Sequence, residues 1–351
     1  MEYPKFKMCV RCFTFNQAKY IEDTMNGFVM QQTDFPFVCC IVDDASTDGE
    51  QDVIDKYLLD NFDFLDKSGG YRKDTDYAFV KFARHKNNHN CYFAVLFLKE
   101  NHYGSPLGFK KKFEYISEWR NKCKYEAFCE GDDYWIDPFK LQKQIDYMKQ
   151  HLECRYLFTA RIIDYEKSFV KIEQKYKKRD YTTFDILSGF NPGIQNAVWY
   201  VEDMERMMEY RGINGDRLYP YLSSLRGKIH YLNEVTSVYR VTGEGVSTKI
   251  NEENVFFHSS NDFYNFHKIL GFPNTNAYLK GEARYLVHNL SRYPFFKIPN
   301  AFVLSYKILK SINERLTVWQ YFYMIYYQVL SKIKNMIGCG DIKTKGFCYE
   351  K

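Results

Sequence analysis

The feature that most constrains the fold is an uninterrupted apolar run at residues 37–42, Phe-Val-Cys-Cys-Ile-Val. A run without polar alternation is typical of a strand buried on both faces, as in parallel sheets covered by helices on both sides. The sequence predicts further strands at residues 8–15, 92–98, 125–129 and 155–163. Helical patterns lie between these runs, at residues 17–31, at 52–61 and after Pro138. This alternation predicts an α/β fold with a mostly parallel central sheet and flanking helices.

Three segments depart from this alternation. Residues 63–90 are polar and irregular, and we expect a long loop or insertion there. Residues 228–232 and 235–241 predict two short strands. From about residue 251 to residue 351 the pattern is helical and rich in Tyr, Phe and Lys. We therefore predict a first domain over residues 1–250 and a helical C-terminal region over residues 251–351.

Composition narrows the class of protein. The net charge of +5 is mild and dispersed, whereas a nucleic-acid-binding protein usually carries a dense basic stripe, so we expect no nucleic-acid partner. Many of the ten cysteines lie inside apolar runs, which predicts buried free thiols in a reducing compartment, and we interpret Cys9-x-x-Cys12 as core. We expect a cytoplasmic protein with no secretory signal and no membrane span. The segment Val318–Leu330 predicts an amphipathic helix that either packs in a core or attaches to a membrane surface.

A first acidic cluster, Glu130-Gly131-Asp132-Asp133, follows the predicted strand at 125–129. Clustered carboxylates repel one another unless a cation is present, and Mg²⁺ and Mn²⁺ are commonly held by one or two carboxylates plus substrate phosphates. Gly131 would let the backbone approach a ligand closely. The alternative is that Asp133 or Asp137 caps the following helix, which accounts for one acid but not for three.

A second acidic cluster, Asp43-Asp44-Ala45-Ser46 with Asp48, follows the buried run at 37–42. Acids at a strand end can accept hydrogen bonds from a ribose hydroxyl or a base N–H group, whereas Ser46 or Asp48 could instead cap a helix. In open α/β sheets, ligands bind beyond the carboxyl ends of the strands. Two acidic strand ends in one parallel sheet therefore indicate a binding site there.

The order of these motifs resembles family 2 glycosyltransferases, which are enzymes of GT-A (Rossmann-like) fold. The match to the opening of that family is carried by Phe13-Thr14-Phe15-Asn16, Tyr20-Ile21, Gln31-Gln32 and Val42 to Gly49, and Glu130 to Asp133 stand where the family keeps its Asp-x-Asp motif. The distal part is carried by Gly215-Asp216, Gly227-Lys228-Ile229, Val238-Tyr239-Arg240 and Gly245-Val246-Ser247. Further matches point toward bacterial members that act on surface polysaccharides: Trp135, Pro138, Lys140, Leu141 and Gln144.

The resemblance implies a nucleotide-sugar half at about residues 1–137 and an acceptor half at about 138–250. It implies that Asp132, with Glu130 or Asp133, binds a divalent metal, Mn²⁺ or Mg²⁺, on the donor diphosphate. Asp216 falls where the family places its catalytic base, which takes the proton of the acceptor hydroxyl. The implied donor-binding residues are Thr14, Phe15, Asn16, Asp43, Asp44, Ser46, Asn101, Gly131 and Trp135.

Three positions depart from the family pattern. Glu130 replaces the usual first Asp, and Thr242 stands where many relatives have a His. If that His binds metal in the relatives, this chain lacks one ligand. Asn101 is only loosely equated with the Asn-Gly turn of the family, because the insertion before it is long.

The resemblance predicts a metal-dependent, inverting glycosyltransferase that moves a sugar from a UDP-linked donor to a glycan or lipid-linked acceptor. We expect a role in bacterial surface or capsular polysaccharide synthesis, at the inner face of the membrane, with the C-terminal helices as a peripheral contact. A nucleotidyltransferase or phosphohydrolase could use the same metal and diphosphate chemistry, but residues 13–16 lack the Gly-rich or basic phosphate loop that it would need. A non-catalytic scaffold that binds a sugar nucleotide also stays open, because of Glu130 and Thr242.

Overall fold

The computed structural model describes residues 4–64, 70–103, 105, 108–187, 190–205, 207 and 215–243. The chain divides into two compact units, residues 1–186 with 190–249 and residues 187–189 with 250–351. Apart from residue 187, the described residues all belong to the first unit. The predicted helical region at 251–351, with the segment Val318–Leu330, lies outside the described residues.

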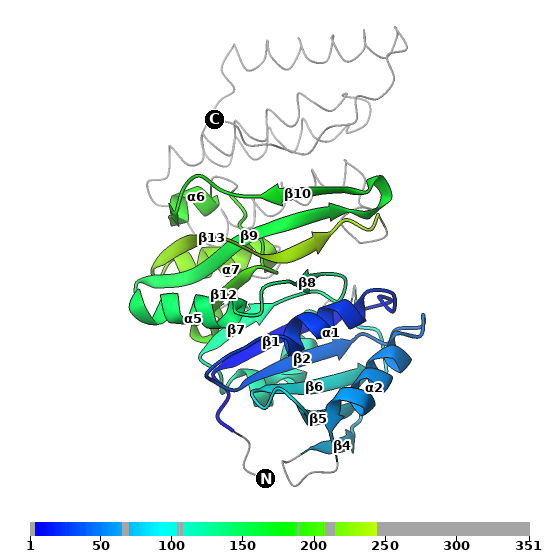
Figure 1. Ribbon diagram of the computed structural model, residues 1–351. Helices are drawn as coiled ribbons and strands as arrows, with labels where there is room; N and C mark the ends of the chain where they lie inside the picture. The colour runs from blue at the N-terminus through cyan, green and yellow to red at the C-terminus, as the bar shows by residue number, and fades with distance from the viewer. Residues whose placement is uncertain are drawn as a thin grey trace, which may run out of the picture. The chain divides into compact units, whose positions relative to one another are not determined.

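A mostly parallel group of four strands forms the centre of the sheet (Figure 1). Its order is β7 (Tyr125–Phe128), β1 (Met8–Thr14), β2 (Phe37–Asp43) and β6 (Cys91–Leu98), and each neighbouring pair is parallel. All seven residues of β2 are buried, as its uninterrupted apolar run predicts. The predicted parallel core of the sheet is therefore confirmed.

Further strands extend this core on both sides. Beyond β7 the order is β12 (Ala197–Tyr200), β9 (Cys154–Tyr165), β13 (Lys228–Arg240) and β11 (Asp180–Tyr181). Beyond β6 lie β5 (Ala78–His85) and β3 (Phe62–Asp63). Three short strands pair off this path: β4 (Tyr71–Asp74) with β5, β8 (Tyr134–Trp135) with β13, and β10 (Val170–Gln174) with β9.

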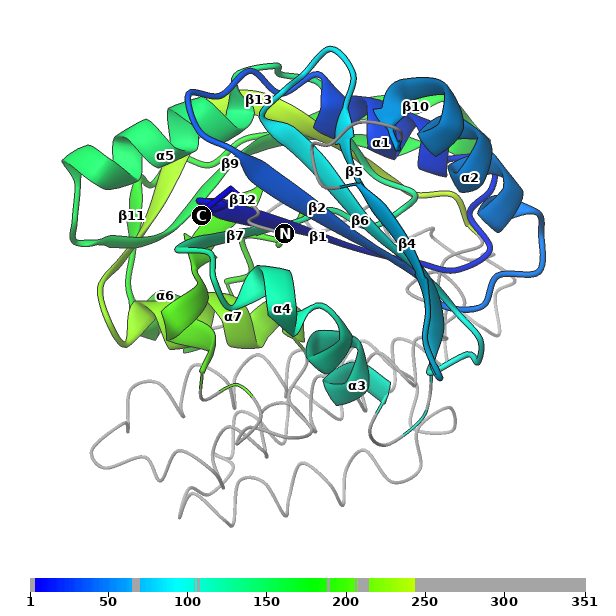
Figure 2. The ribbon, with the colours of Figure 1, turned by 90° about the horizontal axis from the view of Figure 1, so that it is seen from below.

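Helices cover both faces of the sheet (Figure 2). On one face lie α1 (Ile21–Val29), α2 (Glu50–Asn61) and α5 (Lys140–Gln150), whose apolar residues join one buried cluster with alternate residues of β1 and β2. On the other face lie α3 (Gly108–Tyr115), α4 (Ser117–Arg120), α6 (Thr183–Leu187) and α7 (Gly215–Ser224). The short 3-10 helices η1 (Glu166–Ser168) and η2 (Val201–Met204) complete the described elements. The predicted covering of both sheet faces by helices is confirmed.

Two expectations about strands were wrong. Residues 63–90 are not one long loop, because they contain β4 and the eight-residue strand β5, which pairs antiparallel with β6. In β5 the buried Val80 and Phe82 alternate with Phe79 and Lys81 on the outer face, so its polar composition hid a half-buried strand. The two strands expected between residues 228 and 241 are one strand, β13, with register shifts around Val235.

Eight cysteines in the described part of the chain are free and buried, and Cys9 and Cys12 lie in the core as predicted. No helix in the described residues combines the length and the apolar character that a membrane crossing requires.

Candidate functional site

The polar ends of three neighbouring strands meet at one edge of the sheet. β1 pairs in parallel with both β2 and β7, so the residues that follow these strands emerge on the same side. Thr14, the last residue of β1, is in register with Asp43, the last residue of β2. Glu130 to Asp133 follow β7. The two acidic clusters predicted from the sequence therefore flank the end of β1.

Three carboxylates form a compact cluster after β7. One oxygen from each of Glu130, Asp132 and Asp133 lies within 4.8 Å of the others. Glu130 is exposed, Asp132 is half-buried and Asp133 is only 1% exposed. Such a group of oxygen ligands suits a hard divalent cation.

Electrostatics in this cluster disfavours the ionised acids. Surrounding protein, which displaces water, and then the charges of Asp132 and Asp216 raise the pKa of Glu130 to about 8. Burial, followed by the charges of Asp132 and Glu130, holds the pKa of Asp133 well above its usual range. Burial also raises the pKa of Asp132. A bound cation would reverse these shifts, because it stabilises the ionised form of each carboxyl.

The backbone of the cluster is fixed by neighbouring elements. The Thr24 hydroxyl of α1 donates to the carbonyl oxygens of Gly131 (2.9 Å) and Asp133 (2.6 Å). From β13, the Arg240 backbone N–H donates to Asp133 Oδ1 (2.9 Å) and its guanidinium donates to the Asp132 carbonyl oxygen (3.0 Å). Asp133 Oδ2 is buried and has no hydrogen-bond partner among the described residues.

Gly131 lies directly against the end of β1. A Cβ atom at this position would lie 2.1 Å from Thr14 Oγ1 and 2.4 Å from Gln17 Oε1. Any side chain would therefore push β1 and the acidic cluster apart. The close approach of Gly131 in the structure is to the end of β1, and its approach to a ligand stays a prediction.

The second acidic cluster is largely engaged by the protein itself. Asp44 Oδ1 accepts a hydrogen bond from the His102 backbone N–H (2.8 Å), and Asp44 Oδ2 pairs with the Lys112 ammonium group. Asp43 Oδ1 accepts from the Ser46 backbone N–H (3.1 Å) and from the Gln51 side chain. Asp43 Oδ2 is buried without a partner among the described residues, and burial raises the pKa of this carboxyl.

Glu50 is a site residue that our sequence analysis missed. Its side chain is fully buried and accepts hydrogen bonds from the Thr14 hydroxyl, from the Gln17 backbone N–H (2.8 Å) and from the Ser46 hydroxyl (2.9 Å). Burial raises the pKa of Glu50, and these hydrogen bonds oppose that shift. A single carboxylate thus ties the segment after β1 to the segment after β2. Its place at the start of a helix pattern resembles an ordinary first-turn acid, which is why the sequence did not reveal it.

The other predicted donor-site residues occupy these two segments. Asn16, at φ +54°, accepts the Thr47 backbone N–H (2.8 Å) through its side chain, and its own N–H donates to the Ser46 hydroxyl (2.9 Å). Phe15 is 43% exposed beside it. The Asn101 side chain donates to the Asp44 carbonyl oxygen (2.8 Å), which places the loop after β6 against the second cluster.

Trp135 lies apart from these groups. It is 1% exposed, packs edge-to-face on Phe28 and donates its indole N–H to the Gln195 carbonyl oxygen (2.9 Å). The buried ammonium group of Lys140 lies 4.4 Å from its ring centroid. The structure therefore places Trp135 in the core behind the carboxylates, and we do not retain it as a donor-binding residue.

Asp216 occupies the first turn of α7. Its charge raises the pKa values of both Glu130 and the buried Tyr156, which places it within electrostatic range of the first cluster. Thr242 is 7% exposed just beyond β13. The charges of Asp216 and Glu130 thus act on each other, and the roles of base and metal ligand stay predictions.

The amino-acid sequence matches one known family. Residues 11–96 match the family described as glycosyl transferase family 2. The uncharacterized protein Rv1520 of Mycobacterium tuberculosis is 31% identical over 159 residues, which are 45% of this chain and 36% of that protein. TuaG of Bacillus subtilis, named for a proposed role as a teichuronic acid biosynthesis glycosyltransferase, is 28% identical over 147 residues, 42% of this chain and 43% of TuaG. The matched part of the chain thus spans less than half the length of either relative.

Two solved structures share the fold. TarS residues 1–349 of S. aureus, in complex with UDP-GlcNAc, gives a TM-score of 0.50 at 14% identity and covers 95% of this chain and 92% of that chain. The mannosyltransferase PcManGT of Pyrobaculum calidifontis, in complex with GDP-Man and Mn²⁺, gives a TM-score of 0.50 at 13% identity and covers 96% and 88%. At these identities the likeness concerns the fold alone. With the family match, it confirms the predicted resemblance to family 2 glycosyltransferases and the α/β fold of GT-A type.

Proposed function

We propose that the chain is a metal-dependent, inverting glycosyltransferase that moves a sugar from a nucleotide-sugar donor, UDP-linked in our proposal, to a glycan or lipid-linked acceptor. The observation that carries this proposal is the carboxylate cluster of Glu130, Asp132 and Asp133 beside the end of β1. Three acids with raised pKa values at the carboxyl ends of parallel strands have the composition of a metal-diphosphate site. A non-catalytic scaffold does not require such a destabilised group of acids.

The residues present fit Mn²⁺ or Mg²⁺. The ligand set is all oxygen, and the buried Asp133 Oδ2 has no protein partner among the described residues. Asp132 is the ligand that we place first, with Glu130 or Asp133 as the second. The metal, when bound, would neutralise the charge that develops on the departing diphosphate. PcManGT, which has the same fold at low identity, was solved with Mn²⁺ and GDP-Man, in line with this assignment.

The donor nucleotide would lie between the two segments that Glu50 ties together. Asp43 Oδ2 is buried and free to accept a ribose hydroxyl or a base N–H group. Asp44 already pairs with Lys112, so we assign it to holding the pocket in shape. Thr14, Phe15, Asn16 and Ser46 would line the remainder of the pocket.

Asp216 is the proposed catalytic base. Its carboxylate would take the proton of the acceptor hydroxyl while that oxygen attacks the anomeric carbon of the donor sugar. The bond from this carbon to the diphosphate oxygen would break in the same step, so the nucleoside diphosphate leaves and the anomeric configuration inverts. The charge of Asp216 acts on the Glu130 carboxyl, which supports a position near the proposed metal ligands.

The acceptor and the cellular setting extend the proposal further. We propose a surface polysaccharide, with transfer at the cytoplasmic face of the membrane, because TuaG is named for teichuronic acid biosynthesis and the TarS structure holds UDP-GlcNAc. Membrane contact through residues 251–351 is part of the same proposal. Flotation of the full chain with anionic liposomes tests it, and a chain that stays at the bottom of the gradient contradicts it.

A donor panel tests the binding site. The full chain is heated with UDP-, GDP- and dTDP-sugars in the presence of Mn²⁺ or of a chelator. A ligand at 100 times its Kd stabilises the folded state by about 2.7 kcal/mol, which raises the melting temperature by several degrees. We expect one donor class to produce this shift with Mn²⁺ and a much smaller shift with chelator. An equal shift in both conditions would contradict the metal assignment.

Two variants test the chemistry. We expect Asp216→Asn to lower sugar transfer by a factor of about 10²–10⁴, the usual contribution of a general base, while donor binding is kept. Asp132→Asn should remove the Mn²⁺-dependent part of donor binding. Asp52→Asn, another first-turn acid, on the exposed side of α2, is the matched control and should leave both unchanged. Retained transfer in Asp216→Asn would refute the base, and an NMR spectrum showing a retained anomeric configuration would refute inversion.

A further inference from the structure

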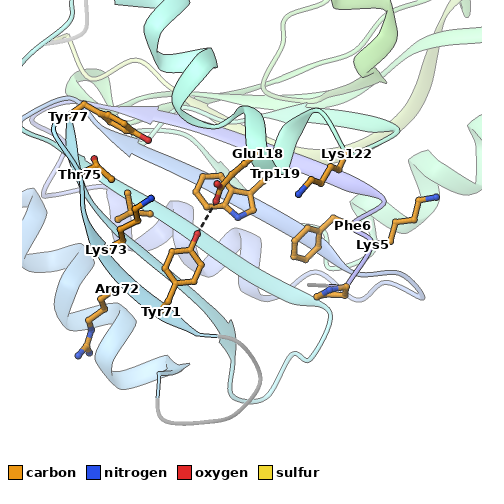
Figure 3. A pocket seen from close by; sticks show the side chains of 12 residues that line it. Lys5, Phe6, Tyr71, Arg72, Lys73, Thr75, Tyr77, Glu118, Trp119 and Lys122 are labelled. Carbon is orange, nitrogen blue, oxygen red and sulfur yellow. Dashed lines mark hydrogen bonds between the residues drawn. The ribbon is translucent and has the colours of Figure 1, made fainter. Parts of the chain in front are cut away.

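A cavity lies over the outer part of the sheet, between β4, the start of β5 and α4 (Figure 3). It has a volume of about 930 Å³, within the range of small-molecule sites. Residues that precede β1, among them Phe6, line it together with β4, the start of β5 and α4. None of its lining residues belongs to the carboxylate cluster or to the two segments that Glu50 ties together, so its lining is distinct from that of the proposed donor site.

The charge around this cavity is strongly unbalanced. Four of its lining residues are cationic and one is acidic: Lys5, Arg72, Lys73 and Lys122 against Glu118. The acid is already engaged, because Glu118 Oε1 accepts a hydrogen bond from the Tyr71 hydroxyl (2.9 Å). Lys73 and Lys122 point into the cavity, and neither has an acidic partner within 4.0 Å in the described part of the chain. The cavity is therefore electrostatically complementary to an anion.

The aromatic lining favours a ligand with many hydroxyl groups over a flat base. The ring of Trp119 stacks on Phe82, at a centroid distance of 6.2 Å, and is only 4% exposed. Tyr71 also stacks on Phe82, and Tyr77 stacks on Tyr115 at 3.9 Å. One face of each of these rings is thus covered by another ring, and the Tyr71 hydroxyl lies beside Glu118 at the cavity wall. Stacking of a nucleobase requires an open ring face, whereas sugar hydroxyls can pair with the polar edges.

One polar group in the floor of the cavity is unsatisfied. The indole N–H of Trp119 is buried and has no acceptor among the described residues. A buried donor without a partner costs free energy, which an acceptor oxygen from a ligand or a water would recover. The Trp119 indole thus adds a hydrogen-bond donor to the cationic side chains that line the cavity.

We propose that this cavity binds an anionic saccharide, that is, a sugar chain carrying carboxylate or phosphate groups. Lys73 and Lys122 would pair with the anionic groups, and the tyrosine hydroxyls would bind the sugar hydroxyls. This binding requires neither donor nor metal, so it stands or falls separately from the sugar transfer proposed above. In a polysaccharide-making enzyme it would hold a charged glycan away from the reacting end.

Matched probes test the ligand class. Binding of tetragalacturonate and of phosphopentamannose to the full chain is measured by calorimetry in chelator, beside their neutral counterparts, methyl-esterified tetragalacturonate and mannopentaose. We expect the anionic form of at least one pair to bind at least tenfold tighter than its neutral form, and raised salt to remove the difference. The pair that responds distinguishes carboxylate from phosphate. Equal binding of the charged and neutral forms, or no binding of either anion, overturns the proposal.

Substitutions and hydrogen exchange locate the site. The double variant Lys73→Gln/Lys122→Gln should bind the responding probe at least tenfold more weakly. In the parent chain, the bound probe should protect the amides of residues 71–77 and 117–122 from hydrogen exchange. The control Lys56→Gln/Lys228→Gln removes two other exposed lysines and changes the net charge equally. An equal loss in the control, or protection at residues 43–46 and 130–133 instead, refutes the site. Tighter binding of UMP with protection of the same two segments would show a nucleotide site and refute the saccharide class.

Discussion

The two acidic strand ends look alike in the sequence but differ in the folded protein. Asp43-Asp44 and Asp132-Asp133 both follow a buried parallel strand. Asp44 has both oxygens engaged, by a backbone N–H of the chain and by the Lys112 ammonium group. Asp132 and Asp133, by contrast, share their space with Glu130, and the protein raises the pKa of all three acids.

This difference indicates which of the two acidic clusters can bind a cation. At the end of β2, a lysine from α3 balances the charge of Asp44, and the buried Asp43 has a raised pKa. Among the described residues, no lysine pairs with a carboxylate at the end of β7, and Arg240 donates its guanidinium to the Asp132 backbone carbonyl rather than to a carboxylate of the cluster. Like charges held this close together are tolerated only if the charge is removed or balanced. We therefore interpret Asp44 with Lys112 as a structural charge pair, and Glu130, Asp132 and Asp133 as a site that a cation completes.

The strongest test of this comparison removes one charge at each strand end and measures the free energy of unfolding, which we expect to change in opposite directions. Asp44→Asn leaves the largely buried Lys112 without its partner, and we expect a loss of about 3–5 kcal/mol in the free energy of unfolding. Glu130→Gln should instead raise the stability of the chelated protein at pH 8, because it removes a charge that the folded state disfavours. Urea unfolding in chelator measures both.

Asp52→Asn is again the control, and an exposed site should change stability by less than about 0.5 kcal/mol. If both test variants destabilise by similar amounts, the two strand ends do not differ as we infer.

The pH dependence of the chelated protein is the next test. The pKa of Glu130 is raised to about 8 in the folded protein from 4.5, so the folded state holds a proton that the unfolded chain releases. Stability should therefore fall as pH rises through this window, with the melting temperature lower at pH 8.5 than at pH 6 by roughly 2–4 °C for each kcal/mol.

Excess Mn²⁺ should reverse this slope, because the metal replaces the proton and binds more tightly at higher pH. Glu130→Gln in chelator should have a shallower slope than the parent chain. A parent chain whose melting temperature is flat from pH 6 to 8.5 in chelator would contradict the charge repulsion on which the comparison rests.

Much of this fold could be predicted from local patterns. Apolar runs located the central strands, and the spacing of Leu141, Ile145 and Met148 identified the buried face of α5, where all three are fully buried. The sequence did not predict β5, because Lys81 and Arg84 interrupt its apolar residues. The continuous strand β13 was divided in two because its bulged middle is polar.

Less of the site could be predicted from the sequence, because the two acidic clusters differ in their contacts with residues far away in the chain. Lys112 lies 68 residues beyond Asp44, and nothing local marks the pair. Trp135 matched a family motif, but a motif does not tell whether a residue binds a ligand or packs in the core. The role of Glu50 could not be predicted either, because its three hydrogen-bond donors come from three other positions in the chain.

The smallest effect concerns the link between the two strand ends. Glu50 joins Thr14, which packs against Gly131 of the first cluster, to Ser46 of the second cluster. In Glu50→Gln the amide nitrogen cannot accept a hydrogen bond, so at least one of the three bonds must be lost or reversed. We expect a loss of about 1 kcal/mol in the free energy of unfolding, together with a raised donor KM at nearly unchanged kcat, because the pocket loosens while the reacting groups stay in place.

Glu22→Gln makes the same change on the exposed face of α1 and should alter neither quantity. A lowered kcat at unchanged KM would show that Glu50 acts on the reacting groups themselves, and the two strand ends would then form one catalytic unit rather than a structural pair beside a metal site.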